Sequence, residues 1–461
     1  MEHIHFIGIG GTGLSAIARV LLEQGYKVSG SDLAVSALFE GIKAAGGIVY
    51  HGHKAENIQG ADLIVRSSAI PDDNPEIQAA LAAGIPVRKR SEFLDRLMEG
   101  KKVIAVAGSH GKTTTTSMLS WILSALDRDP SFIVGGVVEN LGSNARAGRG
   151  DEFVIEADEY DYMFLGLNPD LAVITNIEHD HPDIFPTEES FEKAFRMFVD
   201  RLDPKGVLVL CAEDPGANKM ASHINKSQVL IKYGFEGHGK DYVVRDIVYN
   251  PEGGCEFDLV IADQHGGQFL NITIQLPGEH NVLNAAGAFA AADQLGLDRD
   301  RVIQALGEFE GSERRFDIRG EFQGICLIDD YAHHPTEIRT TLAAARSVYP
   351  DRRILGVWQP HTFSRTQTLF SDFTKSFGDA DGIIVLDVYA AREQAPAGFS
   401  LSTLVDEIES VPVVHISGNE QVVDYLKDEL KPGDVLLIFS AGDAIEINQA
   451  LEKILINQAK N

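Results

Sequence analysis

The chain has few cysteines, a deficit of positive charge and no long apolar run, and each shortage excludes a class of protein. The three cysteines, Cys211, Cys255 and Cys326, match neither a disulfide set nor a zinc site, so we expect reduced thiols in a cytoplasmic protein. The net charge of −28 argues against a nucleic-acid partner. Because no apolar run reaches about 18 residues and no secretion signal precedes the first β-prone run, we expect no membrane partner.

What the chain does have is the composition of a globular protein, with 44% hydrophobic and 23% charged residues. Its 461 residues predict two to four domains. β-prone runs alternate with helical segments, which indicates α/β domains, and polar clusters stand where strands end. An anionic substrate would be repelled by the overall charge, so local basic groups and backbone amides must hold it.

A phosphate-binding loop organises the middle of the chain. The apolar run 103–107 leads into Gly108-Ser-His-Gly-Lys-Thr113, and a helix is expected over 117–126. Loop amides and the helix N-terminus can hold phosphates, while Lys112 balances their charge and the Thr113 hydroxyl binds Mg²⁺. Val106 stands where a Walker A motif has its first glycine. The predicted nucleotide contacts of this loop are Gly108, Ser109, His110, Gly111, Lys112, Thr113 and Thr114.

A glycine-rich turn near the N-terminus predicts a second phosphate site. A β-prone run leads into Gly10, Gly11, Thr12 and Gly13, and Asp32 follows 19 residues after the last of these. This spacing lets the backbone approach a diphosphate, which a nicotinamide, a flavin nucleotide or a UDP-sugar would supply, although a ligand-free βα turn remains the alternative. Ser67 and Ser68 end a later β-prone run, where they either face the ligand or cap the next turn.

Acidic and histidine residues follow the phosphate loop. The run 156–161 ends an apolar strand, and Glu156 is its best Mg²⁺ ligand, whereas we expect Asp161 to be solvated. Two histidines and two carboxylates lie within 178–181; a second Mg²⁺ suits them better than zinc, and we expect His179 to be structural.

Polar residues also gather near helix starts and strand ends in the later part of the chain. His280, Asn281 and Asn284 precede or enter an Ala-rich helix, where they could meet a ligand or cap the helix. The last segment has three further clusters with His or Arg, at 311–317, 330–337 and 358–366. A solvated-loop interpretation explains one of them well and all three poorly.

Together these stretches resemble the Mur ligase family, the ATP-dependent amide-forming enzymes of peptidoglycan precursor synthesis. The short Gly-x-x-Gly-Lys-Thr loop is typical of that family, which accounts for Val106. The matching pieces span nearly the whole chain: 8–13 with 29–32, 67–70, 108–113, 156–159, 175–178 with His181, His280-Asn281 with Asn284, Arg314-Arg-Phe316, 329–337, and 359–361 with Arg365.

The resemblance implies the fold and its division. We expect an α/β chain of three domains, two Rossmann-like ones flanking a central P-loop ATPase-type parallel sheet. The predicted boundaries are 1–100 for a UDP-sugar domain, 101–312 for the ATP domain and 313–461 for the amino-acid domain. The implied cofactors are ATP and Mg²⁺, and the expected state is a monomer or homodimer.

Within the family the chain looks most like the members that join L-alanine to UDP-N-acetylmuramate. The substrate carboxylate would attack the γ-phosphate to give an acyl phosphate and ADP, and the amine would then displace phosphate. Catalysis of such a reaction is mainly positioning and charge stabilisation. By resemblance, one Mg²⁺ lies on Thr113 and Glu156 and a second on His181. The implied catalytic residues are Lys112, His181, His333 and Arg365; further nucleotide contacts are Asn281, Asn284, Arg315 and Asp330; substrate contacts are Gly10, Gly11, Thr12, Gly13, Asp32, Ser67, Ser68 and His361.

Some segments depart from this pattern or favour another function. Arg196 stands about where several members carry a carbamylated lysine, and Lys193 is a weak substitute. Stretches 158–161 and 181–185 look like a ligase that attaches a preformed tripeptide to the same UDP-sugar, whereas 359–366 and 386–392 look like the alanine-adding members. We give more weight to the third domain because it selects the acceptor. A nicotinamide-dependent oxidoreductase and a non-catalytic nucleotide-binding regulator are the remaining alternatives.

Overall fold

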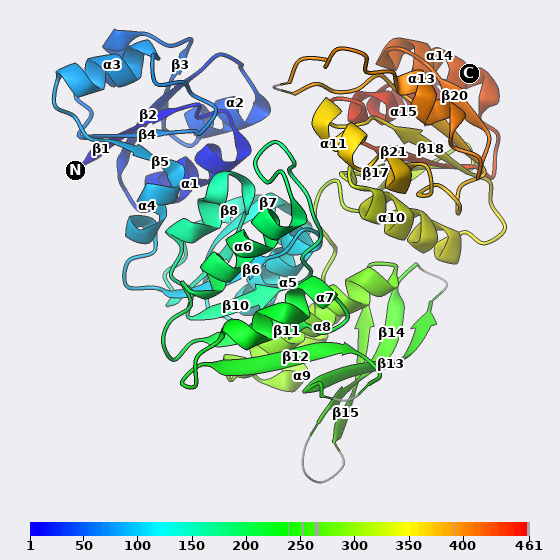
Figure 1. Ribbon diagram of the computed structural model, residues 1–461, viewed down its shortest axis with the longest axis horizontal. Helices are drawn as coiled ribbons and strands as arrows, with labels where there is room; N and C mark the ends of the chain where they lie inside the picture. The colour runs from blue at the N-terminus through cyan, green and yellow to red at the C-terminus, as the bar shows by residue number, and fades with distance from the viewer. Residues whose placement is uncertain (238, 251–252, 263–266, 392, 459–461) are drawn as a thin grey trace.

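In the computed structural model the chain forms three α/β domains, each around its own sheet (Figure 1). The structure describes residues 1–458 apart from 238, 251–252, 263–266 and 392, so Arg392 lies outside the described residues. The first and third domains stand side by side above the central one in this view. This arrangement confirms the predicted class, a three-domain α/β protein with largely parallel sheets.

The first domain is a five-stranded parallel sheet covered by helices. Its strand order reverses at β1, and ligands of open α/β sheets bind at such a reversal. The strands in spatial order are β3 (Ile48–His51), β2 (Lys27–Asp32), β1 (His3–Ile7), β4 (Leu63–Arg66) and β5 (Val87–Lys89). The helices are α1 (Thr12–Glu23), α2 (Ala37–Ala44), α3 (Pro75–Ala82) and α4 (Arg90–Leu97).

A buried polar network lies beneath this sheet around Glu76, whose side chain is fully buried. Its carboxylate accepts hydrogen bonds from the Ser31 hydroxyl (2.6 Å) and the Asn57 amide (2.5 Å), and it lies 3.4 Å from His5 Nε2. Burial opposes the charge, but these partners outweigh it and leave the pKa of Glu76 below 4.5. Burial lowers the pKa of His3 below 6.5. Both groups therefore stabilise the fold in the protonation state that they have at neutral pH.

We expect acid to weaken the first domain through these two groups, because the unfolded chain binds their protons more readily. Protonation of His3 in the unfolded chain begins to lower the free energy of unfolding as the pH falls below 6.5. The stabilisation by Glu76 is complete above about pH 4.5 and is lost as the pH falls below that value. Glu76→Gln should lower the free energy of unfolding at pH 7 by about 1–3 kcal/mol and flatten its decline in acid. Urea unfolding followed by circular dichroism between pH 7 and pH 3 measures both effects. Exposed Glu40→Gln is the control, and an unchanged pH dependence in Glu76→Gln would contradict the assignment.

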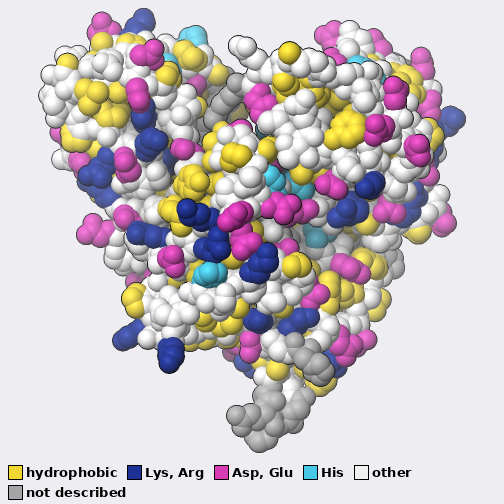
Figure 2. All heavy atoms as spheres, in the orientation of Figure 1, with side chains coloured by type: hydrophobic (Ala, Val, Ile, Leu, Met, Phe, Trp, Pro, Cys, Tyr) yellow, Lys and Arg dark blue, Asp and Glu magenta, His cyan; other side chains and the backbone are white. Residues whose placement is uncertain are grey.

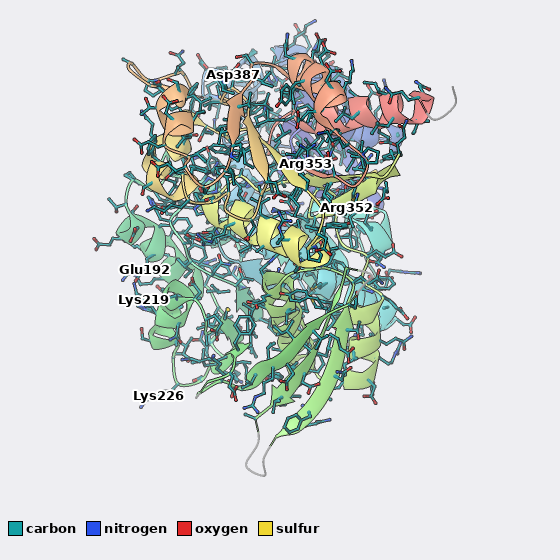
Figure 3. The ribbon with its side chains drawn as sticks, turned by 90° about the vertical axis from the view of Figure 1, so that its right-hand side faces the viewer. Glu192, Lys219, Lys226, Arg352, Arg353 and Asp387 are labelled. Carbon is teal, nitrogen blue, oxygen red and sulfur yellow. The ribbon has the colours of Figure 1, made fainter. Side chains whose placement is uncertain are left out.

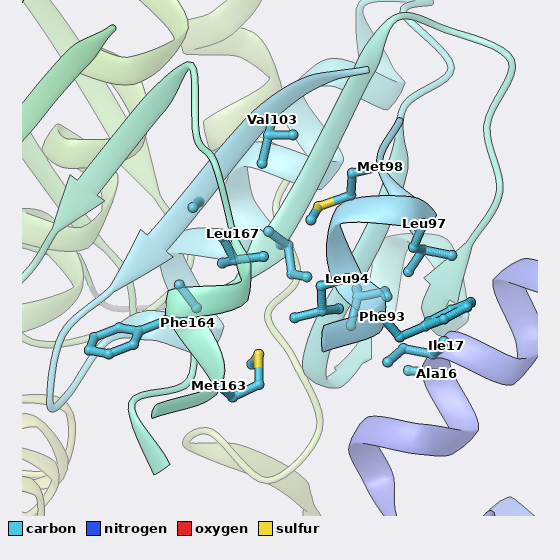
Figure 4. Packing of buried hydrophobic residues seen from close by; sticks show 14 of the residues in the cluster. Ala16, Ile17, Phe93, Leu94, Leu97, Met98, Val103, Met163, Phe164 and Leu167 are labelled. Carbon is cyan, nitrogen blue, oxygen red and sulfur yellow. The ribbon is translucent and has the colours of Figure 1, made fainter. Parts of the chain in front are cut away.

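Helix α4 joins the first domain to the central one through a shared hydrophobic cluster. Figure 4 shows its side chains between helix α1 on one side and central-domain residues on the other. The α4 face contributes Phe93, Leu94 and Leu97; α1 contributes Ala16 and Ile17; the central domain contributes Val103, Met163, Phe164 and Leu167. Since apolar burial stabilises by about 25 cal/mol per Å², this continuous core resists separation of the two domains.

The central domain is a ten-stranded sheet, parallel in its middle and extended by antiparallel strands at both ends. The strands in spatial order are β15 (Gln268–Ile274), β14 (Cys255–Ile261), β13 (Tyr242–Tyr249), β12 (Val229–Phe235), β11 (Val207–Cys211), β10 (Leu171–Ile174), β6 (Lys102–Ala107), β9 (Glu152–Glu156), β7 (Ser131–Val138) and β8 (Ser143–Arg146). The helices are α5 (Lys112–Ala125), α6 (Glu188–Val199), α7 (Pro215–Lys219), α8 (Glu279–Gln294) and α9 (Arg299–Gly307).

Helix α5 begins at Lys112, earlier than the predicted 117–126. Threonine is a weak helix former, and four threonines in succession suggest a loop. Here several hydroxyls have partners: Thr116 Oγ1 donates to Lys112 O (2.7 Å) within the helix, whereas Thr113 donates to Glu156 and Thr115 to Asn284. Burial of the whole helix start then outweighs propensity, so the phosphate loop leads directly into a helix N-terminus.

The third domain is a six-stranded sheet, parallel except for its first strand. The strands in spatial order are β16 (Asp317–Phe322), β17 (Ile325–Asp330), β21 (Val435–Phe439), β18 (Ile354–Trp358), β19 (Gly382–Val385) and β20 (Val413–His415). The helices are α10 (Pro335–Val348), α11 (Phe363–Thr368), α12 (Phe370–Phe373), α13 (Leu401–Asp406), α14 (Asn419–Glu429) and α15 (Ile445–Gln458). Within the described residues, every helix is too short or too polar to cross a lipid bilayer.

Candidate active site

A cavity of about 640 Å³ opens where the three domains meet. Thr12 of the first domain, the phosphate loop of the central domain and Arg365 of the third all line it. Figure 2 shows charged and histidine side chains gathered below the notch between the two upper lobes. The carboxyl ends of the parallel strands converge here, as open α/β sheets arrange their ligand sites.

Neither Gly108 nor Gly111 of the phosphate loop could carry a side chain. A Cβ on Gly108 (φ +143°) would lie 2.0 Å from Thr175 Oγ1, and one on Gly111 (φ +78°) would lie 2.4 Å from Asn284 Oδ1. The loop therefore packs against β10 and α8 with no room for side chains, and its next residues start α5. The Ser109 hydroxyl donates to Glu178 O (2.6 Å), which fixes the loop from its other side. Such a tight loop before a helix N-terminus suits phosphate.

Lys112 extends from the first turn of α5 into the cavity. Its ammonium lies 2.9 Å from Glu159 and also donates to the loop carbonyls Gly108 O and Ser109 O. Burial opposes the charge, but Glu159, Asp158 and Glu156 outweigh it and raise the pKa of Lys112. The lysine is thus a fixed cation, and in this arrangement its charge is balanced by a buried carboxylate.

Thr113 and Glu156 form the pair predicted to hold Mg²⁺. Thr113 Oγ1 donates to Glu156 Oε1 (3.0 Å), and Gly135 N donates to Glu156 Oε2 (2.6 Å). Burial raises the pKa of Glu156 despite nearby Lys112. A hydroxyl and a carboxylate facing one another are oxygen ligands that suit Mg²⁺, and the desolvated carboxylate would gain from a cation.

His181 lies on the other side of the cavity from the loop, with a positive φ of 53°. Its Nε2 is 3.6 Å from Glu159 and 3.7 Å from Asp180. Burial lowers its pKa, but these carboxylates outweigh that effect and raise it overall. His181 and Glu159 could share a second cation with the nucleotide, whereas His179 bonds Phe185 O (2.7 Å) and has the structural role expected of it.

A buried ion pair joins the central and third domains beside His181. Arg365 Nε donates to Asp180 Oδ1 at 2.8 Å, and both side chains are only 3% exposed. Arg365 Nη1 lies 2.9 Å from His361 Nδ1, and its Nη2 lies 3.5 Å from His181 Nδ1. One guanidinium therefore fixes two predicted site histidines from opposite domains.

A second cavity, of about 210 Å³, lies behind the phosphate loop between α8 and the third domain. Its size and mixed apolar and polar lining suit a nucleoside. The predicted nucleotide contacts that line it are His110, Gly111, Thr114, Asn281, Asn284, Arg315 and Asp330.

The cap of α8 is Gly278 rather than an asparagine. Asn281 Nδ2 donates to Pro277 O (2.8 Å), and Asn284 accepts from Thr115 Oγ1 (3.3 Å).

His110 links the loop to both neighbouring acids. Its Nε2 lies 3.1 Å from Glu178, and its Nδ1 lies 3.2 Å from Glu337 at the start of α10. Burial opposes protonation, but the two carboxylates raise the pKa of His110 to about 9. Arg315 approaches the same Glu337 at 3.6 Å. The phosphate loop is thereby in direct contact with the third domain.

The first-domain turn is held by residues on both sides. Asp32 Oδ2 accepts from Gly10 N (2.9 Å), so the acid predicted to meet a substrate also fixes the turn. A Cβ on Gly13 would lie 1.9 Å from Arg90 Nη1, and Arg90 Nη2 bonds Asp158 at 3.1 Å. Arg90 thus connects the glycine turn to the acidic run behind Lys112. Ser67 packs against this turn, 3.1 Å from the Cβ position of Gly8.

His333 and His361 close the third-domain side. Their rings are 5.7 Å apart, and His333 Nδ1 bonds Tyr331 O (2.9 Å). Burial lowers the pKa of both, to about 4 for His361 and well below the usual value for His333. Neutral imidazoles here leave the positive charge of this wall to Arg365, with Arg314 and Arg315.

The predicted residues divide into three groups by position. Those that line the three-domain cavity are Thr12, Ser109, His110, Gly111, Lys112, Thr113, Glu156, His181, Arg315, His333, His361 and Arg365. Those that line only the nucleoside-sized cavity are Thr114, Asn281, Asn284 and Asp330. Those that line neither are Gly10, Gly11, Gly13, Asp32, Ser67, Ser68 and Gly108.

The residues at or near the position of the carbamylated lysine lie outside the three-domain cavity. Lys193 is exposed on α6, and Arg196 approaches Glu192 on the same helix at 3.9 Å. Glu192 in turn pairs with Lys219 (2.9 Å) at the rim of the central domain, where Figure 3 shows the two labels together. Neither Lys193 nor Arg196 lines the cavity.

The sequence prediction missed several charged groups of the site. Glu159 was included only in an acidic run expected as a whole to bind metal, Glu178 and Asp180 were given no role of their own, and Glu337 stood at the end of a matched motif. Arg90 had no signal beyond a short basic run. Their importance depends on partners that fold in from other domains.

Comparison with known proteins agrees with the motifs. Three family models match in succession: "Mur ligase family, catalytic domain" over residues 3–102, "Mur ligase middle domain" over 106–292 and "Mur ligase, glutamate ligase domain" over 314–442. The chain is 42% identical to a UDP-N-acetylmuramate–L-alanine ligase of Desulforamulus reducens, with 98% of each chain covered. It is 41% identical to that of Roseiflexus, covering 99% of this chain and 100% of the relative.

Two solved structures are similar to the chain over nearly its whole length. The UDP-N-acetylmuramate-alanine ligase of Thermotoga maritima superposes with a TM-score of 0.83 at 29% identity and full coverage of both chains. A murein peptide ligase of Psychrobacter arcticus gives a TM-score of 0.74 at 26% identity, with 99% of each chain covered.

Proposed function

Because the chain belongs to the Mur ligase family, we propose that it joins L-alanine to the carboxylate of UDP-N-acetylmuramate with consumption of ATP. The observation that supports this most directly is the cavity to which all three domains contribute, with a phosphate loop between a glycine turn and an Arg/His wall. A two-step reaction that activates a carboxylate and then captures it with an amine needs three ligands to meet at one point.

The proposed first step transfers the γ-phosphoryl group of ATP to a lactyl carboxylate oxygen, giving an acyl phosphate and ADP. Lys112 and the loop amides would hold the phosphates, since two anions must approach one another. Thr113 and Glu156 would hold one Mg²⁺, and His181 with Glu159 would hold a second; the ions supply further positive charge. Asn281, Asn284 and Asp330, which line the smaller cavity, would contact the nucleoside.

The proposed second step is attack of the alanine amine on the acyl carbon, with loss of phosphate and of the ammonium proton. Arg365 is placed to hold the amino-acid carboxylate or the developing oxyanion, because its fork is fixed by Asp180 and His361. His333 and His361, kept neutral by burial, leave the amine free of a competing cation. On the first-domain side, Gly10–Gly13, Asp32, Ser67 and Ser68 remain the proposed contacts of the UDP-sugar.

Acceptor choice tests the proposal. With UDP-N-acetylmuramate, ATP and Mg²⁺ present, L-alanine should stimulate ADP release, and mass spectrometry should find the alanyl product. The tripeptide L-alanyl-γ-D-glutamyl-meso-diaminopimelate is the matched comparison, because a murein peptide ligase also matches the fold. Stimulation by the tripeptide alone would replace the proposal with the recycling activity, and NADH oxidation without ADP release would end the ligase interpretation.

A further inference from the structure

We propose that His110, Glu178 and His334 bind a transition-metal ion of the Zn²⁺ type, at a site distinct from the Mg²⁺ proposed on Thr113 and Glu156. Their candidate ligand atoms all lie within 4.8 Å of one another, and no other such trio occurs among the residues that the structure describes. Two imidazoles and a carboxylate are the donors that zinc-type ions prefer, whereas Mg²⁺ prefers oxygen alone.

The trio draws its members from two domains. His110 belongs to the phosphate loop and Glu178 follows β10, while His334 caps α10 in the third domain. His110 Nε2 lies 3.1 Å from Glu178 Oε2, and the two imidazole rings are 4.5 Å apart. An ion between them would draw these atoms closer together, because its ligand bonds are about 2.0–2.2 Å long.

Outer groups already orient two of the ligands. His110 Nδ1 lies 3.2 Å from Glu337 Oε1, so its Nε2 can face an ion while the other nitrogen faces a carboxylate. The Thr336 hydroxyl donates to Glu178 Oε1 at 2.8 Å, which leaves Oε2 for the ion. Carboxylate–histidine pairs of this kind are typical of metal sites because they fix the tautomer and the ring plane.

The third ligand is a buried imidazole with an unsatisfied atom. His334 is 2% exposed, and its Nε2 has no hydrogen-bond partner among the described residues. Its Nδ1 accepts only a long bond from Thr336 N (3.3 Å). An ion on Nε2 would move the proton to Nδ1 and release that bond, while satisfying an atom whose burial otherwise costs free energy.

An ion at this site would affect domain motion. It would tie the phosphate loop to the third domain, and His110 and Glu178 also line the nucleoside-sized cavity. Entry and exit of ligands in multidomain ligases require the domains to open. We therefore expect Zn²⁺ to hold the closed arrangement and slow turnover.

Co²⁺ added to the metal-free full-length protein, without nucleotide or substrate, tests the site. One equivalent should bind with the visible absorption of four- or five-coordinate Co²⁺, and Zn²⁺ should displace it. His334→Asn and Glu178→Gln should each weaken binding by about 100-fold or more, since loss of an outer partner alone costs 10–100-fold. His333→Asn, the sequence neighbour of the ligand, is the control and should retain the ion.

Binding that is unchanged in His334→Asn, or only the weak spectrum of six-coordinate Co²⁺, would overturn the proposal. Circular dichroism of each variant checks that it is folded, and the two ligand variants give independent readings. Because the titration uses no ATP, UDP-sugar or alanine, its failure would leave the proposed ligase activity unaffected.

Discussion

Lys112→Ala should reduce ATP-dependent product formation by about 10³-fold or more while UDP-N-acetylmuramate still binds. Removing one preorganised group that stabilises transition-state charge typically costs 10²–10³-fold, and phosphoryl transfer depends on several such groups together. The lysine lies in the central domain, whereas the glycine turn proposed for the UDP-sugar lies in the first. ADP release measures the first effect and titration calorimetry with UDP-N-acetylmuramate measures the second.

Two further variants make that result interpretable. Lys112→Ala leaves the Glu159 carboxylate buried without its cation, which could destabilise the fold. Lys112→Met combined with Glu159→Gln removes both charges, so a folded but inactive double variant would show that the loss of activity comes from the missing ammonium. Lys193→Ala, on the exposed face of α6, is the matched control and should keep full activity. Equal loss of UDP-sugar binding and turnover in Lys112→Ala would show that the domain roles are wrongly assigned.

Asp180→Ala should have the largest effect on how the domains hold together. Removal of one partner from a buried ion pair costs about 3–5 kcal/mol, because the remaining charge stays desolvated. Arg365 would then be a 3% exposed guanidinium without any carboxylate of the described residues at hydrogen-bonding distance. Since every 1.4 kcal/mol is a factor of ten, we expect the closed state, and with it kcat/KM, to fall about 100-fold or more.

Small-angle scattering of the free protein should show a larger radius of gyration in Asp180→Ala, and steady-state kinetics should show the loss of kcat/KM. Glu189→Ala is the control, because Glu189 is an exposed carboxylate in the first turn of α6. The double variant Asp180→Asn, Arg365→Gln should lose less than the sum of the single changes. Additive losses, or an unchanged radius, would contradict the pairing as the cause.

Much of this site followed from local sequence. The phosphate loop, Glu156, His181 and the third-domain clusters stand at the ends of strands, and parallel sheets bring those ends to one edge. The fold class followed from the same alternation of strands and helices. Helix α10 begins at Pro335, whose fixed φ and missing donor suit the first helical turn.

Interactions between domains could not be predicted in this way. Asp180 and Arg365 are 185 positions apart, and nothing near either residue indicates the other. Even within the central domain, Glu159 was predicted only as part of a metal-binding acidic run, and its pairing with Lys112, 47 positions away, has no signal in the sequence. Propensity also failed at the start of α5, because the threonines there are buried and several of their hydroxyls find partners on the helix, on Glu156 and on α8, a compensation that no sequence window shows.

The pairing of Lys112 with Glu159 has a consequence for product release. Without a competing carboxylate, the Lys112 ammonium would bind ADP as tightly as ATP, and ADP would dissociate slowly. Here the Glu159 carboxylate, 2.9 Å away, competes with the nucleotide for the Lys112 ammonium. A nucleotide must displace Glu159 when it binds, and Glu159 can pair with Lys112 again when the nucleotide dissociates. We expect Glu159→Gln to bind ADP more tightly when Mg²⁺ is absent, because the Lys112 ammonium then has no competing carboxylate.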